Sequence, residues 1–302
     1  MKIIDGHIHI FSKIDGANAN GSVKGCGYGK TINAGIESPF MPPLTKETCF
    51  TADMLLEVMR QNGVEKAVLF QNPTIGSVNE EIGLAVSEHP EIFAGVLQVD
   101  PFSEDALEQA ERLLENYTYR ALKLELSTGW GWTGIHKEKE FHYSMLKPLV
   151  EFAGKHRLAV VFDTGDTDSK AYLPGELDEL TAQFPEVTFV IEHGGYLTPE
   201  GDREKWEQMT DIACRENVYL GICAIWSLLE SEYPGESGND ILKRLYDKVG
   251  AEKLIWGTDA PCTCKFYTYG QMMDVVRKHA RFLSEEELES VCYGNAQKVY
   301  FS

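Results

Sequence analysis

The sequence predicts an α/β protein of the closed (β/α)8 type, the TIM barrel, with residues 1–302 forming a single domain. Three observations carry this prediction. Short β-branched runs alternate eight times with segments of helical apolar spacing. Strands joined by crossover helices pair in parallel, and eight such units suffice to close a barrel. The length is also compatible with the roughly 250 residues that one barrel uses. An open, doubly wound sheet is the alternative, but no Gly-x-Gly-x-x-Gly turn follows the first strand.

The predicted elements follow one another regularly along the chain. Strands are expected over residues 2–10, 66–71, 93–99, 121–126, 159–162, 187–191, 218–223 and 253–256. Helical patterns are expected over residues 51–61, 103–114, 143–155, 175–183, 203–215, 241–248 and 271–282. Thr51 is the expected N-cap of the first of these helices, because its hydroxyl can accept a hydrogen bond from the first turn.

Residues 11–50 interrupt the alternation. This stretch is rich in Gly, Asn, Pro and Ser and contains no element that the pattern predicts. We interpret it as a long loop insertion after the first strand. If it is ordered, a loop of this length is expected to serve as a lid or binding loop, and a mobile excursion is the alternative.

The charge balance limits the partners of the chain. It has 28 Lys and Arg against 47 Asp and Glu, a formal net charge of −19. Nucleic acid and anionic membranes would be repelled, so neither is an expected partner. No apolar run is long enough to span a bilayer, and we expect a cytoplasmic protein that acts on a small molecule.

The seven scattered cysteines are interpreted as thiols. A homo-oligomer is compatible with the sequence.

Two histidines on the first predicted strand are candidate metal ligands. His7 and His9 are two residues apart, so the strand period places both, with Asp5, on one face. Near the carboxyl end of a barrel strand that face points into the mouth, where active sites of this architecture lie. Two imidazoles there suit a transition metal. A buried, hydrogen-bonded pair of structural histidines is the alternative.

Two further polar residues follow other predicted strands. Asp259 comes after the eighth strand, which pairs with the first in a closed barrel and brings this carboxylate towards His7 and His9. His193 follows the sixth strand and is a candidate proton carrier. A helix N-cap is the alternative role for Asp259, and a hydrogen bond to a loop carbonyl is the alternative for His193.

These motifs together resemble the amidohydrolase superfamily, specifically its amidohydrolase-2 branch of metal-dependent hydrolases and decarboxylases. The resemblance spans nearly the whole chain, and four ordered segments carry it: Ile4-Asp5-Gly6-His7-Ile8-His9, Glu192-His193-Gly194-Gly195, Trp256-Gly257-Thr258-Asp259-Ala260-Pro261 and Gly294-Asn295-Ala296-Gln297-Lys298-Val299-Tyr300. It implies that His7 and His9 bind one divalent metal ion and that Asp259 is both a ligand and the general base. It also implies that His193 carries a proton or polarises the substrate, and that the terminal helix is structural.

One position departs from the pattern of this branch. Where a histidine usually ends the fifth strand, this chain has Asp163, which we expect to be a further metal ligand. A second carboxylate would reduce the charge of the site and make the ion a weaker Lewis acid. Zn²⁺ is the expected ion, and Mn²⁺ or Mg²⁺ are alternatives. The pyrone-dicarboxylate lactonases, also similar, are thought to work without metal, so a metal-free site remains an alternative.

The fourth strand and the loops supply candidate substrate-binding residues. Lys123 and Glu125 share the face that points into the barrel, with Leu122, Leu124 and Leu126 on the opposite face. A buried lysine needs a partner, so Lys123 pairs with Glu125 or binds an anionic substrate. Trp130 and Tyr196 are expected at the mouth, where aromatic side chains sandwich cyclic substrates, and ordinary loop packing is the alternative. The same possibility applies to Trp132, His136, Trp226, Lys265, Tyr267 and Tyr269. Cys262 and Cys264 are interpreted as unpaired thiols.

These residues predict a hydrolase of a small carbonyl compound, such as a lactone, that bears a carboxylate. In this hypothesis metal-activated water attacks the substrate, Asp259 accepts the proton, and His193 with Lys123 stabilises the oxyanion. Two alternatives stand beside it. One is non-oxidative decarboxylation of an aromatic or unsaturated acid on the same scaffold. The other is an inactive barrel that only binds a carboxylated ligand.

Overall fold

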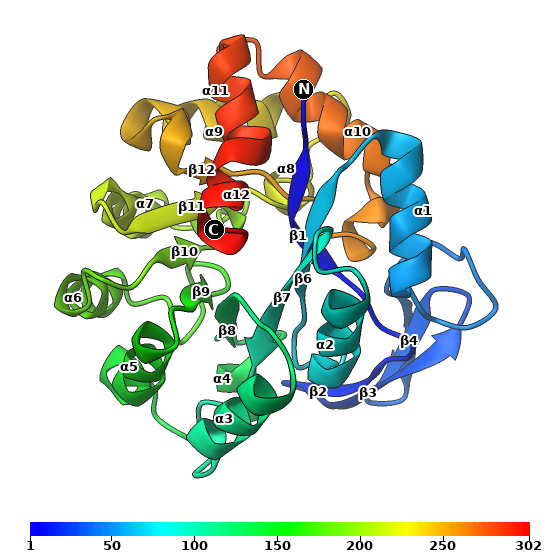
Figure 1. The fold of residues 1–302 in the computed structure, drawn as a ribbon, viewed down its shortest axis with the longest axis vertical. Coiled ribbons are helices and arrows are strands. Elements are labelled where there is room, and N and C mark those ends of the chain that lie inside the picture. The colour runs from blue at the N-terminus through cyan, green and yellow to red at the C-terminus, as the bar shows by residue number, and fades with distance from the viewer.

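The computed structural model describes all 302 residues and contains an eight-stranded parallel sheet in the order β1-β6-β7-β8-β9-β10-β11-β12. Helices surround this ring of strands on its outside (Figure 1). Backbone hydrogen bonds join the first and last strands: Gly6 N donates to Trp256 O at 3.0 Å, and His9 N donates to Ala260 O at 2.9 Å. The predicted (β/α)8 barrel is therefore confirmed.

Each barrel strand overlaps a strand predicted from the sequence. The strands are β1 (Ile4–His9), β6 (Lys66–Phe70), β7 (Phe93–Gln98), β8 (Ala121–Glu125), β9 (Ala159–Asp163), β10 (Phe189–Ile191), β11 (Val218–Gly221) and β12 (Leu254–Ile255). The agreement has a simple cause, because strands covered on both faces consist almost entirely of apolar and β-branched residues.

The helices also follow the predicted pattern, with additions. They are α1 (Ala52–Asn62), α2 (Asn79–Glu88), α3 (Ala106–Asn116), α4 (Trp132–Ile135), α5 (Lys147–Lys155), α6 (Pro174–Gln183), α7 (Arg203–Asp211), α8 (Ile225–Leu228), α9 (Glu236–Val249), α10 (Tyr269–Asp274), α11 (Glu285–Glu289) and α12 (Asn295–Tyr300). The side chain of Thr51 caps α1 by accepting a hydrogen bond from Met54 N, as predicted. The helix α2 was not predicted. None of the helices is long and apolar enough to cross a bilayer.

Two apolar layers stabilise the barrel. The larger one, 71 buried residues, lies between the strands and the helices and includes the predicted leucines Leu122, Leu124 and Leu126. The smaller one, 13 buried residues, fills the barrel interior and includes Ile4, Val68 and Tyr300. Tyr300 belongs to α12, which lies near the centre of the ring in Figure 1. The terminal helix therefore closes the amino end of the barrel and leaves the carboxyl end for the site.

Residues 11–50 form a second sheet, and the expectation of a loop without elements is wrong. Four antiparallel strands pair in sequence order: β2 (Asp15–Asn18), β3 (Gly21–Gly27), β4 (Lys30–Asn33) and β5 (Ile36–Pro39). Gly21, Gly29 and Gly35 adopt positive φ angles of 102°, 71° and 79° at or beside the turns, a conformation that favours glycine. The strands escaped prediction because most of their side chains are exposed, so they show no apolar alternation.

A bulge in β1 corrects the predicted orientation of Asp5. In the pairing of β1 with β6, Asp5 lies opposite Ala67 and Ile8 lies opposite Leu69, so three steps along one strand match two along the other. Such a bulge reverses the inward and outward alternation. Asp5 consequently faces α10, where its carboxylate accepts a hydrogen bond from the Tyr269 hydroxyl at 2.8 Å. It does not share the face of the two histidines.

Gly6 and Gly257 allow β1 and the segment after β12 to approach closely at the seam of the barrel, where the first and last strands meet. A Cβ at Gly257 would lie 2.6 Å from the backbone nitrogen of His7. We expect Gly257→Ala to lower the free energy of unfolding by about 3 kcal/mol, because the backbone of β1 cannot move aside. Denaturant unfolding measures the effect. Gly175→Ala is the control: a Cβ there meets nothing within 4 Å, so stability should stay equal or rise by up to about 1 kcal/mol.

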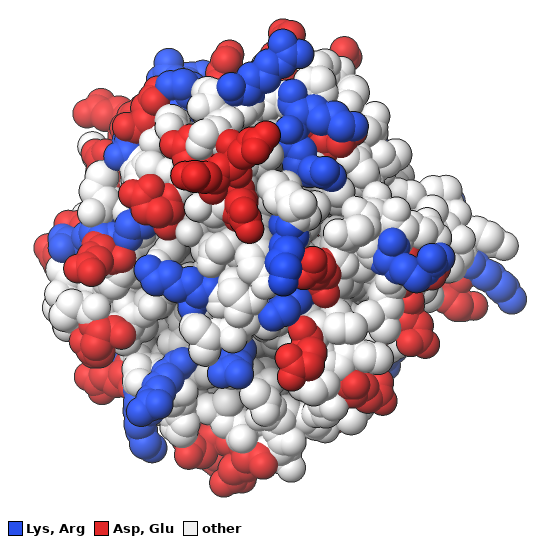
Figure 2. All heavy atoms as spheres, turned by 45° about the horizontal axis from the view of Figure 1, so that its top comes forward, with Lys and Arg blue, Asp and Glu red and all other residues white.

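The charged residues are mixed on the surface. On the face that Figure 2 shows, basic side chains alternate with acidic ones and form no continuous basic surface.

All seven cysteines carry free thiols, as predicted.

Candidate active site

A cavity of about 310 Å³ opens at the carboxyl ends of the barrel strands. Its lining combines charged, polar and aromatic side chains from most of the strand ends and from the insertion. The lining residues are His9, Phe40, Asn72, Lys123, Glu125, Ser127, Trp130, Asp163, His193, Tyr196, Ala224, Ser227, Leu228, Asp259, Cys262, Thr263, Lys265 and Phe266. This is the position that active sites occupy in barrels of this architecture.

His7, His9 and Asp259 converge at the base of this cavity. Their donor atoms all lie within 4.8 Å of one another. The distance from His9 Nε2 to Asp259 Oδ1 is 3.0 Å, and the distance from His7 Nε2 to the same oxygen is 3.8 Å. Both imidazoles are buried, whereas Asp259 is partly exposed to the cavity. The two-residue spacing places both histidines on one face of β1, and the bulge puts Asp5 on the other face.

The hydrogen bonds of the two imidazoles fit a bound cation. His9 Nδ1 lies 3.0 Å from the carbonyl oxygen of Phe70, which can only accept, so Nδ1 carries the hydrogen. The lone pair on His9 Nε2 then faces the carboxylate oxygen of Asp259. Both atoms are acceptors, so a proton or a cation must lie between them. His7 is more demanding, because neither of its ring nitrogens has a hydrogen-bond partner although both are buried. Burial lowers the pKa of His7, which favours the neutral form that binds metal.

Asp163 lies outside this group of ligand atoms. Its carboxylate oxygen Oδ2 is 3.0 Å from His193 Nε2 and 3.6 Å from Lys123 Nζ. Lys123 Nζ is itself 2.8 Å from Glu125 Oε2. These four residues are buried and form a continuous ionic network beside the candidate metal ligands. In the structure Lys123 is therefore paired with the chain's own carboxylates, and the role of Asp163 as a ligand stays a prediction.

The network shifts the pKa of each member. Burial and the neighbouring Asp163 raise the pKa of Glu125 to about 7. Burial alone would also raise the pKa of Asp163, but His193 and Lys123 hold it well below its usual range. Burial acts to lower the pKa of His193, yet Cys223 and Asp163 raise it well above the ordinary value. At neutral pH the network therefore presents a charged imidazolium and a charged lysine to the cavity.

Asp259 stays ionised beside these groups. Burial acts to raise the pKa of its carboxyl, but the hydrogen bond with His9 and the nearby imidazoles lower it. An ionised carboxylate that reaches the cavity can accept a proton from a bound water.

The backbone is held in the left-handed region at several site residues. His193, Tyr196, Ala224 and Asp259 have φ angles of 58°, 56°, 59° and 56°. For residues other than glycine this conformation is uncommon and costs energy, and such residues concentrate at functional sites. The strain turns the chain sharply at the ends of β10, β11 and β12, so that these side chains face the cavity.

The aromatic loop residues divide into two groups. Trp130, Tyr196 and Lys265 line the cavity, as the sequence suggested. Others are used in packing: Tyr269 is buried against Asp5, Tyr267 donates a hydrogen bond to Ser231 O, and Trp226 donates one to Asn239. Trp132 does not line the cavity, and His136 pairs with Asp100 at 2.7 Å.

Several neighbours of the site were not found from the sequence. Phe40 reaches the cavity from the end of the insertion, and Asn72 does so from the loop after β6. Glu192 and Cys223 lie beside His7 and His193 inside the barrel. Asn72 and Glu192 directly follow predicted strands and Cys223 ends one, but that signal applies equally to many residues without function, and Phe40 had no such signal.

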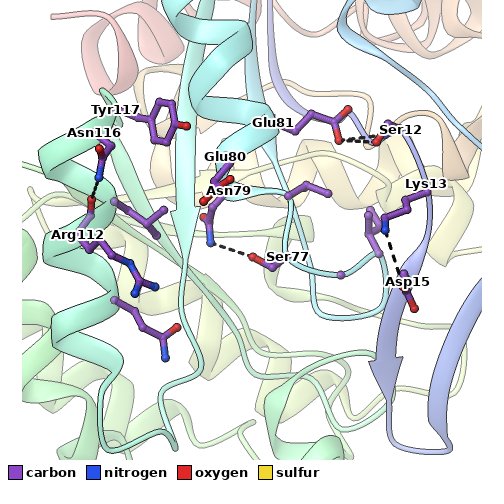
Figure 3. Close-up of a pocket in the computed structure, with 15 residues that line it drawn as sticks. Ser12, Lys13, Asp15, Ser77, Asn79, Glu80, Glu81, Arg112, Asn116 and Tyr117 are labelled. Atoms are coloured by element: carbon purple, nitrogen blue, oxygen red, sulfur yellow. Dashed lines mark hydrogen bonds and ion pairs between the residues drawn. The ribbon is translucent and has the colours of Figure 1, made fainter.

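A second cavity, of about 400 Å³, lies between the insertion, α2 and α3 (Figure 3). Glu81 there accepts two hydrogen bonds from Ser12, at 3.0 and 3.1 Å. None of the charged residues that line this cavity is buried. It contains none of the candidate catalytic residues and offers no comparable cluster.

The structure thus combines a closed (β/α)8 barrel with a cluster of two histidines and an aspartate at its carboxyl end, as in hydrolases of the amidohydrolase type. Residues 4–301 match the family described as Amidohydrolase. The chain belongs to this family.

Individual relatives are more distant. An L-fucono-1,5-lactonase from Burkholderia ambifaria is 24% identical over 271 residues, covering 86% of this chain and 89% of the relative. An amidohydrolase from Burkholderia multivorans with bound zinc has a TM-score of 0.73 at 16% identity, over 100% of this chain and 99% of that one. A probable 2-pyrone-4,6-dicarboxylic acid hydrolase from Acinetobacter baumannii with bound citric acid has a TM-score of 0.69 at 17% identity, with both chains fully covered. The two structures show a shared fold.

Proposed function

We propose that this protein is a metal-dependent hydrolase that opens a small, neutral, polyhydroxylated lactone of the sugar-acid class. The single observation that carries the proposal is the convergence of His7, His9 and Asp259 beside a charged network in one cavity. The family membership and the L-fucono-1,5-lactonase among the relatives support hydrolysis of a lactone.

His7, His9 and Asp259 would hold one divalent cation. Two imidazoles with a carboxylate suit Zn²⁺ best, and Mn²⁺ or Mg²⁺ are alternatives. When bound, the cation supplies Lewis acidity to the reacting water and carbonyl group. The side chains of the protein must supply the remaining proton transfers and charge stabilisation.

Asp259 is the proposed general base. Its carboxylate is ionised, reaches the cavity, and is held by His9 at 3.0 Å, so it can accept the proton of the attacking water. His193 and Lys123 are the proposed stabilisers of the negative charge that develops on the carbonyl oxygen. Both are buried cations that line the cavity, and Asp163 holds His193 in place at 3.0 Å. Asp259 would then return the proton to the ring oxygen that leaves.

The lining favours a neutral substrate over a carboxylated one. The expectation of a carboxylate depended on a free Lys123, whereas in the structure Glu125 and Asp163 neutralise this lysine. The cavity contains no arginine: its cationic side chains are Lys123 and His193, both paired with carboxylates, and the exposed Lys265. Carboxylates, Asn72 and serine hydroxyls instead offer many hydrogen-bonding partners for hydroxyl groups. Aromatic side chains at the mouth provide flat apolar surfaces for a ring.

A lactone panel tests this proposal. We expect sugar-acid lactones to be hydrolysed with solvent oxygen-18 entering the product, and a lactone that bears two carboxylates to react far more slowly. Release of CO2 from an aromatic or unsaturated acid, without entry of solvent oxygen, would favour the decarboxylase alternative and contradict the proposal. Absence of turnover across both panels would favour the inactive binding barrel.

Removal of metal provides a second test. Dialysis against a chelator should abolish turnover, and added Zn²⁺ or Mn²⁺ should restore it. His7→Gln should bind less than about one tenth of the wild-type metal by elemental analysis, because it removes a ligand. Full activity in a chelated preparation with no measurable metal would show that the reaction needs none.

Trp130 is expected to contribute to substrate binding. Its side chain is 51% exposed at the mouth of the cavity, a high exposure for tryptophan. We expect Trp130→Ala to raise KM about fivefold with a smaller change in kcat, because one aromatic contact is worth about 1 kcal/mol. Trp130→Phe is the control and should keep most of the affinity. Steady-state kinetics with the best lactone of the panel measure both variants.

A further inference from the structure

Two side chains meet His7 on the side opposite the candidate catalytic metal site. Glu192 Oε2 lies 3.2 Å from His7 Nδ1, and Cys223 Sγ lies 3.2 Å from the same carboxylate oxygen. All three residues are buried, and their donor atoms lie within 4.8 Å of one another. His193 Nδ1 is also near, at 3.3 Å from Cys223 Sγ.

The Cys223 thiol donates a hydrogen bond to Glu192 Oε2, but no hydrogen bond accounts for the ring nitrogens of His7. His7 Nδ1 is close to Glu192 but is not aligned with it for a hydrogen bond, and both ring nitrogens of His7 lack a partner. The buried hydroxyl of Tyr300 also lacks one. Nearly all buried polar atoms in proteins are satisfied, so unpaired nitrogens on one ring indicate a missing binding partner.

We propose that His7 Nδ1, Glu192 and Cys223 form a second cation site, separate from the one formed with His9 and Asp259, and that it binds a soft divalent cation such as Zn²⁺ or Cd²⁺. Zinc bonds of about 2.0 Å to nitrogen or oxygen and about 2.3 Å to sulfur, at tetrahedral angles, place neighbouring donors roughly 3.3–3.6 Å apart. The two donor separations that involve Glu192 Oε2, both 3.2 Å, are close to this spacing.

Neighbouring residues hold these donors in place. The His7 ring stacks on Phe70, with ring centroids 3.9 Å apart and planes 7° apart, which fixes the directions of its two nitrogens. Gly221 leaves the space that Glu192 occupies, since a Cβ at this position would lie 2.1 Å from Glu192 Oε2. The position of the carboxylate against His7 and Cys223 therefore depends on a glycine in β11.

The donor set determines the chemistry of the site. A thiolate selects soft cations over Mg²⁺ and Ca²⁺. On binding, the Cys223 thiol loses its proton to solvent, and the thiolate with the Glu192 carboxylate balances the charge of the ion, so the buried site is neutral overall.

A neutral imidazole has one lone pair, so His7 serves only one site at a time. With a cation on Nδ1, His7 carries its hydrogen on Nε2 and is withdrawn from His9 and Asp259. The second site thus competes with the proposed catalytic site for a shared ligand, so a thiol-binding cation in excess of the equivalent that restores turnover should inhibit through it.

Cadmium alone is the probe for the experiment, because thiolate coordination to Cd²⁺ produces a charge-transfer absorption band in the near ultraviolet. The full chain is used with the exposed Cys26 and Cys214 replaced by serine, and bound metal is removed with a chelator first. We expect one equivalent of Cd²⁺ to produce the band. Cys223→Ser and His7→Gln in this background should abolish it, while His9→Gln and Cys262→Ser, the matched controls, should keep it.

The outcomes separate the two sites. A band that persists in Cys223→Ser at unchanged intensity would overturn the proposal, as would a band that requires His9. Circular dichroism melts establish that each variant folds. If Cys223→Ser does not fold, Cys223→Ala removes the thiol in its place. The measurement requires no turnover, so its result is independent of whether the lactone is hydrolysed.

Discussion

Asp259→Asn should reduce kcat by about 10³-fold or more while leaving the fold intact. The amide has nearly the shape of the carboxylate but cannot accept the proton of the attacking water, and loss of a general base typically costs 10²–10⁴-fold. The substitution also weakens the candidate metal site, because it removes one anionic ligand. The φ angle of 56° at this position is one that asparagine tolerates well, so no new backbone strain arises.

Single-turnover and steady-state kinetics measure the loss, and thermal melts measure the fold. Asp259→Ala serves as a comparison: it should be equally inactive but less stable, because alanine is strained in the left-handed region. Wild-type turnover in Asp259→Asn would remove the proposed mechanism.

Asp5→Ala should lower the free energy of unfolding by about 3–5 kcal/mol, because it leaves several buried donors without an acceptor. The Asp5 carboxylate accepts hydrogen bonds from Thr258 N at 2.9 Å, from Thr258 Oγ1 at 2.6 Å, from Tyr269 at 2.8 Å and from His7 N at 3.3 Å. These bonds join β1, the segment after β12 and α10 at the seam of the barrel. Burial raises the pKa of Asp5 to about 6 although these donors act to lower it, which shows how completely the carboxyl is enclosed.

Denaturant unfolding compares this variant with Tyr269→Phe, which removes only one of the four donors. The control should cost about 1 kcal/mol. Equal losses in the two variants would mean that the hydroxyl alone stabilises the seam and that the bonds to Thr258 contribute little.

The sequence was most informative where burial and chemistry coincide. Parallel strands with both faces covered read as short apolar runs, which is why all eight could be located. His7, His9, Asp259 and His193 could be placed near one another because each follows or ends such a strand, and strand ends of a closed barrel meet at one rim.

Other features depend on contacts that no local pattern reveals. The bulge in β1 alters the face of Asp5, and a bulge is defined by the register with β6. The pairing of Lys123 with both Glu125 and Asp163 depends on two adjacent strands, so Asp163 could not be assigned to this network from its own surroundings. Likewise, Glu192 and Cys223 lie beside His7 only because β1, β10 and β11, which are distant in the chain, meet in the barrel.

The sheet formed by the insertion has a consequence for how this protein diversifies. Its strands pair with one another, β2 also donates backbone hydrogen bonds to the loop after β6, and Phe11 and Phe50 join the two ends of the insertion with reciprocal backbone bonds of 2.8 and 2.9 Å. Directly after its last strand, Phe40 reaches the candidate active-site cavity. Replacement of the insertion as one unit can therefore change which ligands the cavity accepts, while His7, His9 and Asp259 in the barrel stay unaltered.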